Sequence, residues 1–222
     1  MVFCCLFLVI HGGGMHGYAW GQDADPQEQD SCLIFALGDS LTAGYGLAPE
    51  HGFTALLQER LDSLGYSVQV VNAGVSGDTT EGGLARLDWA LGGLDRSPDV
   101  ALVELGANDA LRGDDPAETY ANLEHIVLRL KEQGAVVLLA GMYAMANMGQ
   151  EYSDEYNTLF ARLADKHELV FYPFFLEGVA GNNELNQWDG IHPNEQGTQI
   201  IVDRILPTVE QTLALAGCSI EP

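Results

Sequence analysis

The feature that most constrains the fold of this chain is a repeated alternation of short apolar runs with longer amphipathic segments. Several of the runs are apolar at successive positions, which is typical of strands covered on both faces. The sequence therefore predicts buried β-strands over residues 32–37, 66–71, 100–105, 135–140 and 168–172.

The segments between these runs carry apolar residues at helical spacing. Asp115 followed by Pro116 is typical of a helix start, because Asp caps the first turn and Pro fits its first position. Pro207 is expected to bend or interrupt the last helix. The pattern predicts helices over residues 53–64, 115–133, 156–167 and 201–213.

Strand and helix alternate along the whole chain, which predicts a parallel sheet with helices on both faces. No internal repeat, long linker or low-complexity tract interrupts the pattern, so residues 32–222 are expected to form one domain. In such folds, ligands and catalytic groups gather at the carboxyl ends of the strands. Residues that directly follow each predicted strand are therefore the candidates for chemistry.

The charge of the chain excludes some classes of partner. Acidic residues outnumber basic ones by 32 to 9, which gives a net charge of −23. Such a chain repels phosphate, so we expect neither nucleic acid nor an anionic membrane surface as a partner. The same charge disfavours polyanionic substrates such as acyl-CoA, unless a local basic pocket near Arg86 or Arg112 overrides it. Most of the charge is interpreted as a solvated surface.

The N-terminus resembles a secretory signal peptide. Residues 1–22 contain no charged side chain, and the apolar run over 2–10 is too short to span a membrane. Small residues at Ala19 and Gly21 offer a cleavage site. We predict a signal peptide over 1–21, a flexible acidic leader over 22–31, and a secreted or periplasmic protein without a stable membrane anchor. Because the usual basic residues are missing, a cytoplasmic protein with a misassigned start is the alternative.

Two of the four cysteines would remain after signal cleavage. Cys32 and Cys218 lie at opposite ends of the predicted domain. Export would permit a disulfide between them. Two free thiols are equally compatible with the sequence, because pairing depends on geometry.

A serine follows the first predicted strand in the string Gly38-Asp39-Ser40-Leu41. On the turn out of a strand, the Ser40 hydroxyl would lie at the edge where active sites form. If a helical turn begins at Ser40, its backbone N–H points to the same edge. The alternative is a serine that only caps a helix.

Glycine-containing segments follow the second strand. Gly74 would leave its backbone N–H free to face a substrate oxygen, and Asp78 with Glu81 is typical of a capping box. A phosphate-binding loop is excluded, because the third glycine of that motif is absent and the chain is strongly negative.

An asparagine follows the third strand in the string Gly106-Ala107-Asn108-Asp109. Its amide could donate a hydrogen bond to an oxyanion that develops during acyl transfer. The alternative is an ordinary turn, in which Asn and Asp bind their own backbone.

A histidine and an aspartate precede the last helix. The spacing of three lets Asp189 meet His192 across one turn, so that the carboxylate fixes the imidazole and leaves its other nitrogen as a base. The other histidines of the mature chain (His51, His125 and His167) lie in helical patterns without such a partner. Together, these segments supply a nucleophile, a base, an orienting acid and three oxyanion donors.

The chain resembles the SGNH (GDSL-motif) hydrolase family. The resemblance covers the domain from about residue 32 to the last helix. It is closest to the secreted bacterial arylesterase, acyl-CoA thioesterase and lysophospholipase type, with further similar stretches at 76–79, 83–87, 102–106, 111–113 and 189–194. Four blocks match in order: Gly38-Asp39-Ser40-Leu41, the Gly74 block, Gly106-x-Asn108-Asp109 and Asp189-x-x-His192.

This resemblance implies a three-layer α/β/α sandwich with a flavodoxin-like parallel sheet of about five strands. It implies that Ser40 is the nucleophile, His192 the general base and acid, and Asp189 its partner. The oxyanion hole would consist of the Ser40 and Gly74 N–H groups and the Asn108 side chain. Asp39 and Asp109 would hold their loops. No metal or organic cofactor is implied.

The implied activity is that of a serine esterase on small-molecule carboxylic esters or thioesters, with aryl esters, acyl esters, lysophospholipids and acyl-CoA as substrate classes. The alternatives are a carbohydrate O-acetyl esterase and, from another class, a non-catalytic ligand-binding module. Oligomeric state is not predicted. Loop methionines would suit an adaptable acyl pocket, although ordinary packing explains them equally well. The expected substrate-binding residues are Val75, Met142, Tyr143, Met145 and Trp188.

Overall fold

The computed structural model describes Met1 and residues 31–220. Its sheet is entirely parallel, with strand order β2-β1-β3-β4-β5, which confirms the predicted α/β fold. The strands lie within a few residues of their predicted positions. They are β1 (Cys32–Gly38), β2 (Val68–Gly74), β3 (Val100–Glu104), β4 (Val136–Ala140) and β5 (Val170–Tyr172).

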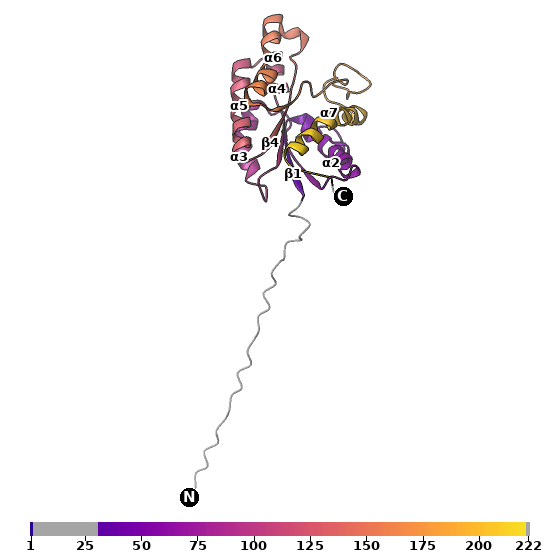
Figure 1. Cartoon of the computed structure of the whole chain (residues 1–222). Coiled ribbons are helices and arrows are strands. Elements are labelled where there is room, and N and C mark those ends of the chain that lie inside the picture. The colour runs from indigo at the N-terminus through magenta and orange to yellow at the C-terminus, as the bar shows by residue number, and fades with distance from the viewer. Residues whose placement is uncertain (2–30, 221–222) are drawn as a thin grey trace.

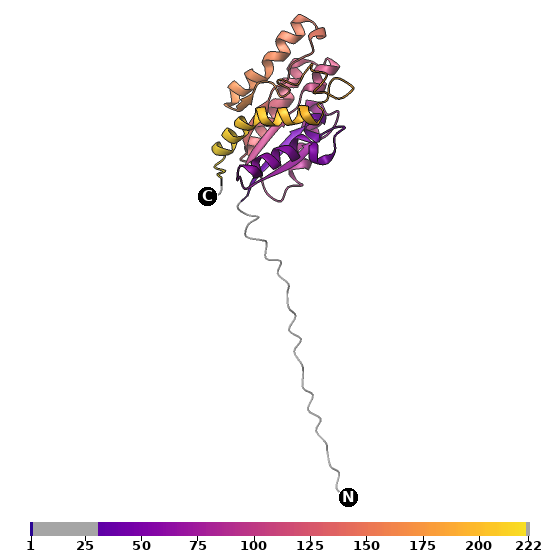
Figure 2. The same cartoon turned by 90° about the vertical axis from the view of Figure 1, so that its right-hand side faces the viewer.

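Helices cover both faces of this sheet, so the domain has three layers. Figure 1 shows α3, α5 and α6 on one face, with α2 and α7 on the other. In Figure 2, α7 runs beside α2 in front of the sheet. The helices are α1 (Ser40–Ala43), α2 (Phe53–Ser63), α3 (Thr80–Leu91), α4 (Ala107–Arg112), α5 (Pro116–Glu132), α6 (Gln150–His167) and α7 (Glu195–Leu215), with 3₁₀ turns at Pro49–His51 and Ala146–Met148.

Burial of the strands follows their position in the sheet. β1 is buried at six of its seven positions and β3 at all five, because helices cover both of their faces. β2 is an edge strand, and most of its residues are half-buried or exposed. The apolar runs noted in the sequence are therefore most continuous where the sheet is covered on both sides.

Two helix termini test the predicted capping signals. Asp115 caps α5 by accepting a hydrogen bond from the Ala117 N–H at 2.8 Å, as expected. The cap of α3 is not Asp78 but Thr79, whose hydroxyl accepts from Gly82 N–H. The Asp78 carboxylate instead pairs with Arg86.

The prediction that Pro207 would bend or interrupt the last helix is wrong as to interruption, since α7 continues through it. Pro207 cannot donate to the carbonyl of Asp203 one turn earlier. Both residues lie on the exposed face of α7, where water can satisfy that carbonyl.

The two ends of the domain are covalently joined. Cys32 at the start of β1 and Cys218 after α7 form a disulfide across a sequence separation of 186 residues, with the Cα atoms 6.0 Å apart. This resolves the alternative that the sequence left open. The predicted signal peptide (1–21) and leader (22–31) lie outside the described residues, except for Met1 and Ser31. Within the part of the chain that the structure describes, no helix is both long enough and apolar enough to cross a membrane.

The strand order places a topological switch beside β1. The chain passes from β1 to β2 on one side and then to β3 on the other side of β1. Crevices at the carboxyl ends of such strands are the usual ligand sites of open α/β sheets. The residues that follow β1 and β3 are Asp39-Ser40 and Leu105-Gly106-Ala107-Asn108.

Candidate active site

Ser40 lies on the tight turn that leaves β1. It is the first residue of the short helix α1, as expected, and its side chain is mostly buried. Asp39 caps this helix, because its Oδ1 accepts from the Leu41 N–H at 2.9 Å. Gly44 ends it in the left-handed conformation, with φ 78°. The turn is therefore fixed at both ends around the serine hydroxyl.

His192 connects this serine to an aspartate. The His192 Nε2 lies 2.9 Å from Ser40 Oγ, and its Nδ1 lies 2.7 Å from Asp189 Oδ2. The other carboxylate oxygen accepts from the backbone N–H groups of Ile191 at 2.9 Å and His192 at 3.0 Å. The predicted spacing of three thus brings the carboxylate and imidazole together.

Hydrogen bonding sets the charge of this aspartate. The hydrogen bond from the Ile191 N–H has the largest effect and the bond from the His192 ring the next largest, and together they lower the pKa of Asp189 to about 2. Because the carboxylate is ionised, the proton of a neutral imidazole belongs on Nδ1. Nε2 is then the nitrogen that can accept the Ser40 hydroxyl proton.

Asn108 approaches the serine turn from α4, which follows β3. Its Nδ2 donates to Asp39 Oδ2 at 3.0 Å and to the Asp78 carbonyl at 2.8 Å. The amide is therefore held between the β1–α1 turn and the β2–α3 loop. Both of its hydrogens have acceptors here, so donation to a substrate oxygen requires the exchange of one of them.

The structure does not favour Gly74 as an oxyanion donor. Its N–H already donates to Asn72 Oδ1 at 2.9 Å, and the Asn72 amide is itself held by Thr42 O and Thr54 Oγ1. A Cβ at position 74 would lie 2.4 Å from the backbone nitrogen of Ala43. Close packing of α1 against β2 therefore explains why glycine is needed here.

Gly77 offers the geometry that was expected of Gly74. Its φ of 86° suits glycine, and a Cβ there would meet no atom within 4 Å. Its N–H makes no hydrogen bond to any residue that the structure describes, and the same holds for the Ser40 N–H. The loop that carries Gly77 also carries the Asp78 carbonyl bound by Asn108.

Two buried acids lie beneath the serine turn. Burial raises the pKa of Asp39 to about 6. Burial also raises the pKa of Glu104 well above its ordinary value, and the nearby charge of Asp39 adds to the effect. Glu104 Oε2 accepts from the Thr42 hydroxyl at 2.7 Å, whereas Oε1 has no partner among the described residues. Burial removes the water that would stabilise each carboxylate and so disfavours the charged form of both acids.

Asp109 holds the neighbouring loop, in agreement with the role expected for it. Its carboxylate accepts from the Thr80 N–H at 3.0 Å and from the Thr80 hydroxyl at 2.5 Å. The Thr119 hydroxyl lies 3.4 Å away. Burial raises the pKa of Asp109, and these bonds oppose the rise. The start of α3 is thereby tied to α4.

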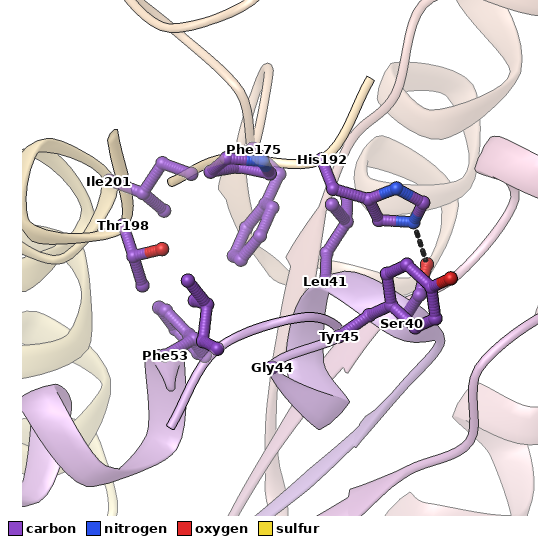
Figure 3. Close-up of a pocket in the computed structure, with 11 residues that line it drawn as sticks. Ser40, Leu41, Gly44, Tyr45, Phe53, Phe175, His192, Thr198 and Ile201 are labelled. Atoms are coloured by element: carbon purple, nitrogen blue, oxygen red, sulfur yellow. Dashed lines mark hydrogen bonds between the residues drawn. The ribbon is translucent and has the colours of Figure 1, made fainter. Parts of the chain in front are cut away.

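A small, partly open cleft adjoins Ser40 and His192 (Figure 3). The Tyr45 ring lies against the imidazole, with the ring centroids 4.6 Å apart. The remaining lining is mainly apolar. It consists of Leu41, Gly44, Leu47, Phe53, Phe175, Pro193, Thr198 and Ile201.

The expected substrate-binding residues divide into two groups. Met142 is buried in the core, with 2% exposure, so ordinary packing explains it and its predicted contact with substrate is not supported. Val75, Tyr143, Met145 and Trp188 are exposed on loops after the strands, and Trp188 reaches 96% exposure. These four remain available to a bound substrate.

Sequence reasoning missed several residues around the catalytic groups. Tyr45 follows the serine turn, but no spacing rule pairs it with a histidine 147 positions later. Phe175 was hidden in an apolar stretch. Gln187 joins the loop after α1 to the loop before α7, because its Nε2 donates to Tyr45 O at 2.7 Å and to Pro193 O at 3.0 Å. Within residues 31–220, no group of three or more His, Cys, Asp or Glu side chains is arranged to hold a metal ion.

Comparisons with known proteins agree with this arrangement. The model of the GDSL-like lipase/acylhydrolase family matches residues 36–200. Esterase TesA of Pseudomonas aeruginosa is 38% identical over 187 residues, which is 84% of this chain and 92% of TesA. The thioesterase 1/protease 1/lysophospholipase L1 of Escherichia coli is 39% identical over 174 residues, covering 78% of this chain and 80% of that protein.

A solved structure shares both the fold and the sequence pattern. The psychrotrophic esterase EstA from Pseudoalteromonas sp., solved in a form inhibited by monoethylphosphonate, superposes with a TM-score of 0.77 at 34% identity. The match covers 82% of this chain and 98% of that one. The chain therefore belongs to the GDSL-like lipase/acylhydrolase family of SGNH hydrolases, which act on ester bonds.

Proposed function

We propose that this protein is a serine esterase that hydrolyses carboxylic esters or thioesters through a covalent acyl-enzyme. The observation that carries this proposal is the continuous series of contacts from Asp189 Oδ2 to His192 Nδ1, at 2.7 Å, and from His192 Nε2 to Ser40 Oγ, at 2.9 Å. These distances meet the geometric requirement for proton transfer from a nucleophile to its base.

In the first step, Ser40 Oγ attacks the carbonyl carbon while its proton passes to His192 Nε2. Asp189 stabilises the imidazolium that forms. The tetrahedral intermediate collapses as Nε2 returns the proton to the leaving alcohol or thiol. In the second step, water replaces Ser40 as the nucleophile, and the acid and free Ser40 hydroxyl are released. No external redox reagent or cofactor takes part.

The oxyanion of each intermediate would be held by three donors. We assign these to the backbone N–H groups of Ser40 and Gly77 and to the Asn108 amide. Gly77 replaces Gly74 in this assignment, because the Gly74 N–H is engaged by Asn72. Asn108 would exchange its bond to Asp39 Oδ2 or Asp78 O for one to the oxyanion.

The substrate class is proposed to be neutral or zwitterionic acyl and aryl esters, with acyl-CoA disfavoured. The cleft beside Ser40 is mainly apolar, and the net charge is −23. Arg86 is paired with Asp78, whereas the exposed Arg112 donates to Gly77 O and keeps its positive charge, so the negative charge is offset there at one point only. Exposed Tyr143 and Trp188 would border the acyl and leaving groups.

A chain-length series of p-nitrophenyl esters, with one thioester and one lysophospholipid, tests this proposal. Ser40→Ala should lower kcat at least about 10⁴-fold, because the nucleophile is lost. A fluorophosphonate should label the wild type and leave Ser40→Ala unlabelled. Full activity of Ser40→Ala would exclude the proposed nucleophile, and a strict preference for acetyl over longer chains would favour a carbohydrate O-acetyl esterase.

The proposed place of action is outside the cytoplasm. The Cys32–Cys218 disulfide supports this, since such bonds persist in oxidising compartments. The uncharged segment before Asp23 supports it as well. Mass spectrometry of protein recovered from the periplasm or medium should show a chain that begins near residue 22 and does not react with a thiol reagent until it is reduced. An intact, reduced chain in the cytoplasm would contradict this proposal.

A further inference from the structure

Arg86, on α3, joins two segments that flank the proposed oxyanion hole. Its Nε donates to Asp78 Oδ2 at 2.5 Å, and its Nη2 donates to the Gly38 carbonyl at 3.0 Å. The side chains of Arg86 and Asp78 are each only 17% exposed. Among the described residues, Arg86 makes no hydrogen bond to Ser40, Asn108 or His192.

Each acceptor of Arg86 stands next to a proposed oxyanion donor. Gly38 ends β1, two residues before Ser40, whereas Asp78 directly follows Gly77. The Asp78 carbonyl also accepts from Asn108 Nδ2 at 2.8 Å. Ser40 and Gly77 therefore belong to the two segments that the Arg86 side chain connects, and Asn108 is hydrogen-bonded to one of them.

The chemistry of arginine suits such a bridge. Its planar guanidinium presents several N–H groups in fixed directions, so it can hold a carboxylate and a carbonyl at a set separation. A lysine ammonium is a single point charge and cannot reproduce this two-point geometry. These segments are also joined by the pairing of β1 with β2, which reaches Gly38 and Gly74, and by the bond from Val75 N–H to Gly38 O at 3.0 Å. Arg86 adds a charged connection to these backbone contacts.

We infer that Arg86 is a positioning residue that sets the separation of the Ser40, Gly77 and Asn108 oxyanion donors by bridging Gly38 O and the Asp78 carboxylate. This inference rests on the proposed function. Because Arg86 acts on donors that bind the developing oxyanion, its loss should reduce the stabilisation of the transition state more than the binding of the substrate.

The test compares Arg86→Lys and Arg86→Ala with the wild type on a p-nitrophenyl ester and on the matching thionoester. A misplaced donor should lower kcat for the ester by about 10- to 100-fold, with KM changed by less than about threefold. Sulfur accepts hydrogen bonds weakly, so the thionoester gains less from the oxyanion hole. The ratio of ester to thionoester kcat should therefore fall in both variants, a result that general loss of folded enzyme would not produce.

Two further measurements separate positioning from simple destabilisation. Added guanidinium should restore part of the ester activity of Arg86→Ala, because it can occupy the vacated bridge. Arg129→Ala is the matched control: Arg129 also binds α3, through Asp88 at 2.7 Å, and it contacts Glu132 at 3.3 Å on the exposed surface. That variant should keep the wild-type kcat and the wild-type ratio.

A wild-type kcat in Arg86→Lys, or an equal loss toward ester and thionoester in a folded variant, would overturn the inference. If Arg86→Ala does not fold, Arg86→Lys decides the question, with thermal unfolding as the check on folding. Failure of the proposed function is recognised separately, because then the wild type would not hydrolyse esters or Ser40→Ala would remain active.

Discussion

The proposed catalytic groups come from two halves of the site that are built differently. The nucleophile half consists of residues 38–42, 74–80 and 104–109, which end or follow β1, β2 and β3. The base half is the single loop 187–194 before α7. In the nucleophile half, Asn108 binds Asp39 across 69 positions, and Thr42 binds Glu104 across 62. In the base half, Asp189 binds His192 across three.

This difference in range is matched by a difference in burial. Asp39 and Glu104 are fully buried, whereas the Asp189 and His192 side chains are about one-fifth exposed. The pKa values of the two aspartates consequently shift in opposite directions. Burial raises the pKa of Asp39 to about 6, and hydrogen bonds lower the pKa of Asp189 to about 2. The protein thus keeps Asp189 ionised for chemistry, whereas burial makes Asp39 easier to protonate.

The largest effect should come from the base half. In Asp189→Asn, Oδ1 can still accept from the Ile191 and His192 N–H groups, but the new amide donates to His192 Nδ1. The imidazole is then held in the wrong tautomer, with its proton on Nε2. We expect kcat to fall by about 10⁴-fold, as measured by ester hydrolysis. A loss of only a few-fold would show that Asp189 does not control the tautomer.

The nucleophile half should show a smaller loss of activity. Asn108→Ala removes one proposed oxyanion donor and should lower kcat by about 10²- to 10³-fold, with KM nearly unchanged. Fluorophosphonate labelling of Ser40 should persist at a reduced rate, because the serine–histidine contact remains. Asn122→Ala, which loses a weaker contact to Thr80 at 3.3 Å on the other side of the loop, is the control and should stay near wild type. Equal kcat in Asn108→Ala and wild type would remove Asn108 from the mechanism.

The same contrast explains which parts of the fold could be predicted from the sequence. The covered strands β1 and β3 were readily predicted, because burial on both faces leaves a continuous apolar run. The edge strand β2 extends three residues past its predicted end into Asn72-Ala73-Gly74, where the apolar run has stopped. Glu168 was expected in a strand, yet it ends α6 in the left-handed conformation, with φ 53°. Helix ends and sheet edges depend on tertiary neighbours that a local pattern does not contain.

The site follows the same rule. The Asp189–His192 contact was predictable, because a spacing of three is a local property. Which glycine presents a free N–H was not predictable. That choice depends on Asn72, whose side chain is held by Thr42 and Thr54 from elsewhere in the chain and occupies the Gly74 N–H. Only the folded geometry separates Gly74 from Gly77.

The smallest effect, on stability, compares the two aspartates directly. The pKa of Asp39 is raised from 3.8 to about 6, so the folded state binds its proton more tightly than the unfolded chain does. The contribution of Asp39 to the free energy of unfolding is fully present below about pH 4 and is lost as the pH rises through about 6. Asp39→Asn should therefore lose less thermal stability than the wild type between pH 4 and 6.5, by about a few degrees in Tm.

Asp189 should behave in the opposite way. Because its pKa is lowered to about 2, its contribution is present above about pH 4 and is lost as the pH falls toward 2. Asp189→Asn should accordingly reduce the change of Tm with pH below about pH 4, and it should leave the slope of the Tm profile between pH 4 and 6.5 unchanged. Glu104 is the exception among the other carboxylates, because the Asp39 charge contributes to its raised pKa. Subtracting the Asp39→Asn profile from the wild type therefore reports Asp39 together with Glu104, whereas the Asp189→Asn difference reports Asp189. If both variants flattened the same pH interval, burial and hydrogen bonding would not be separating the two aspartates, and the contrast between the halves would fail.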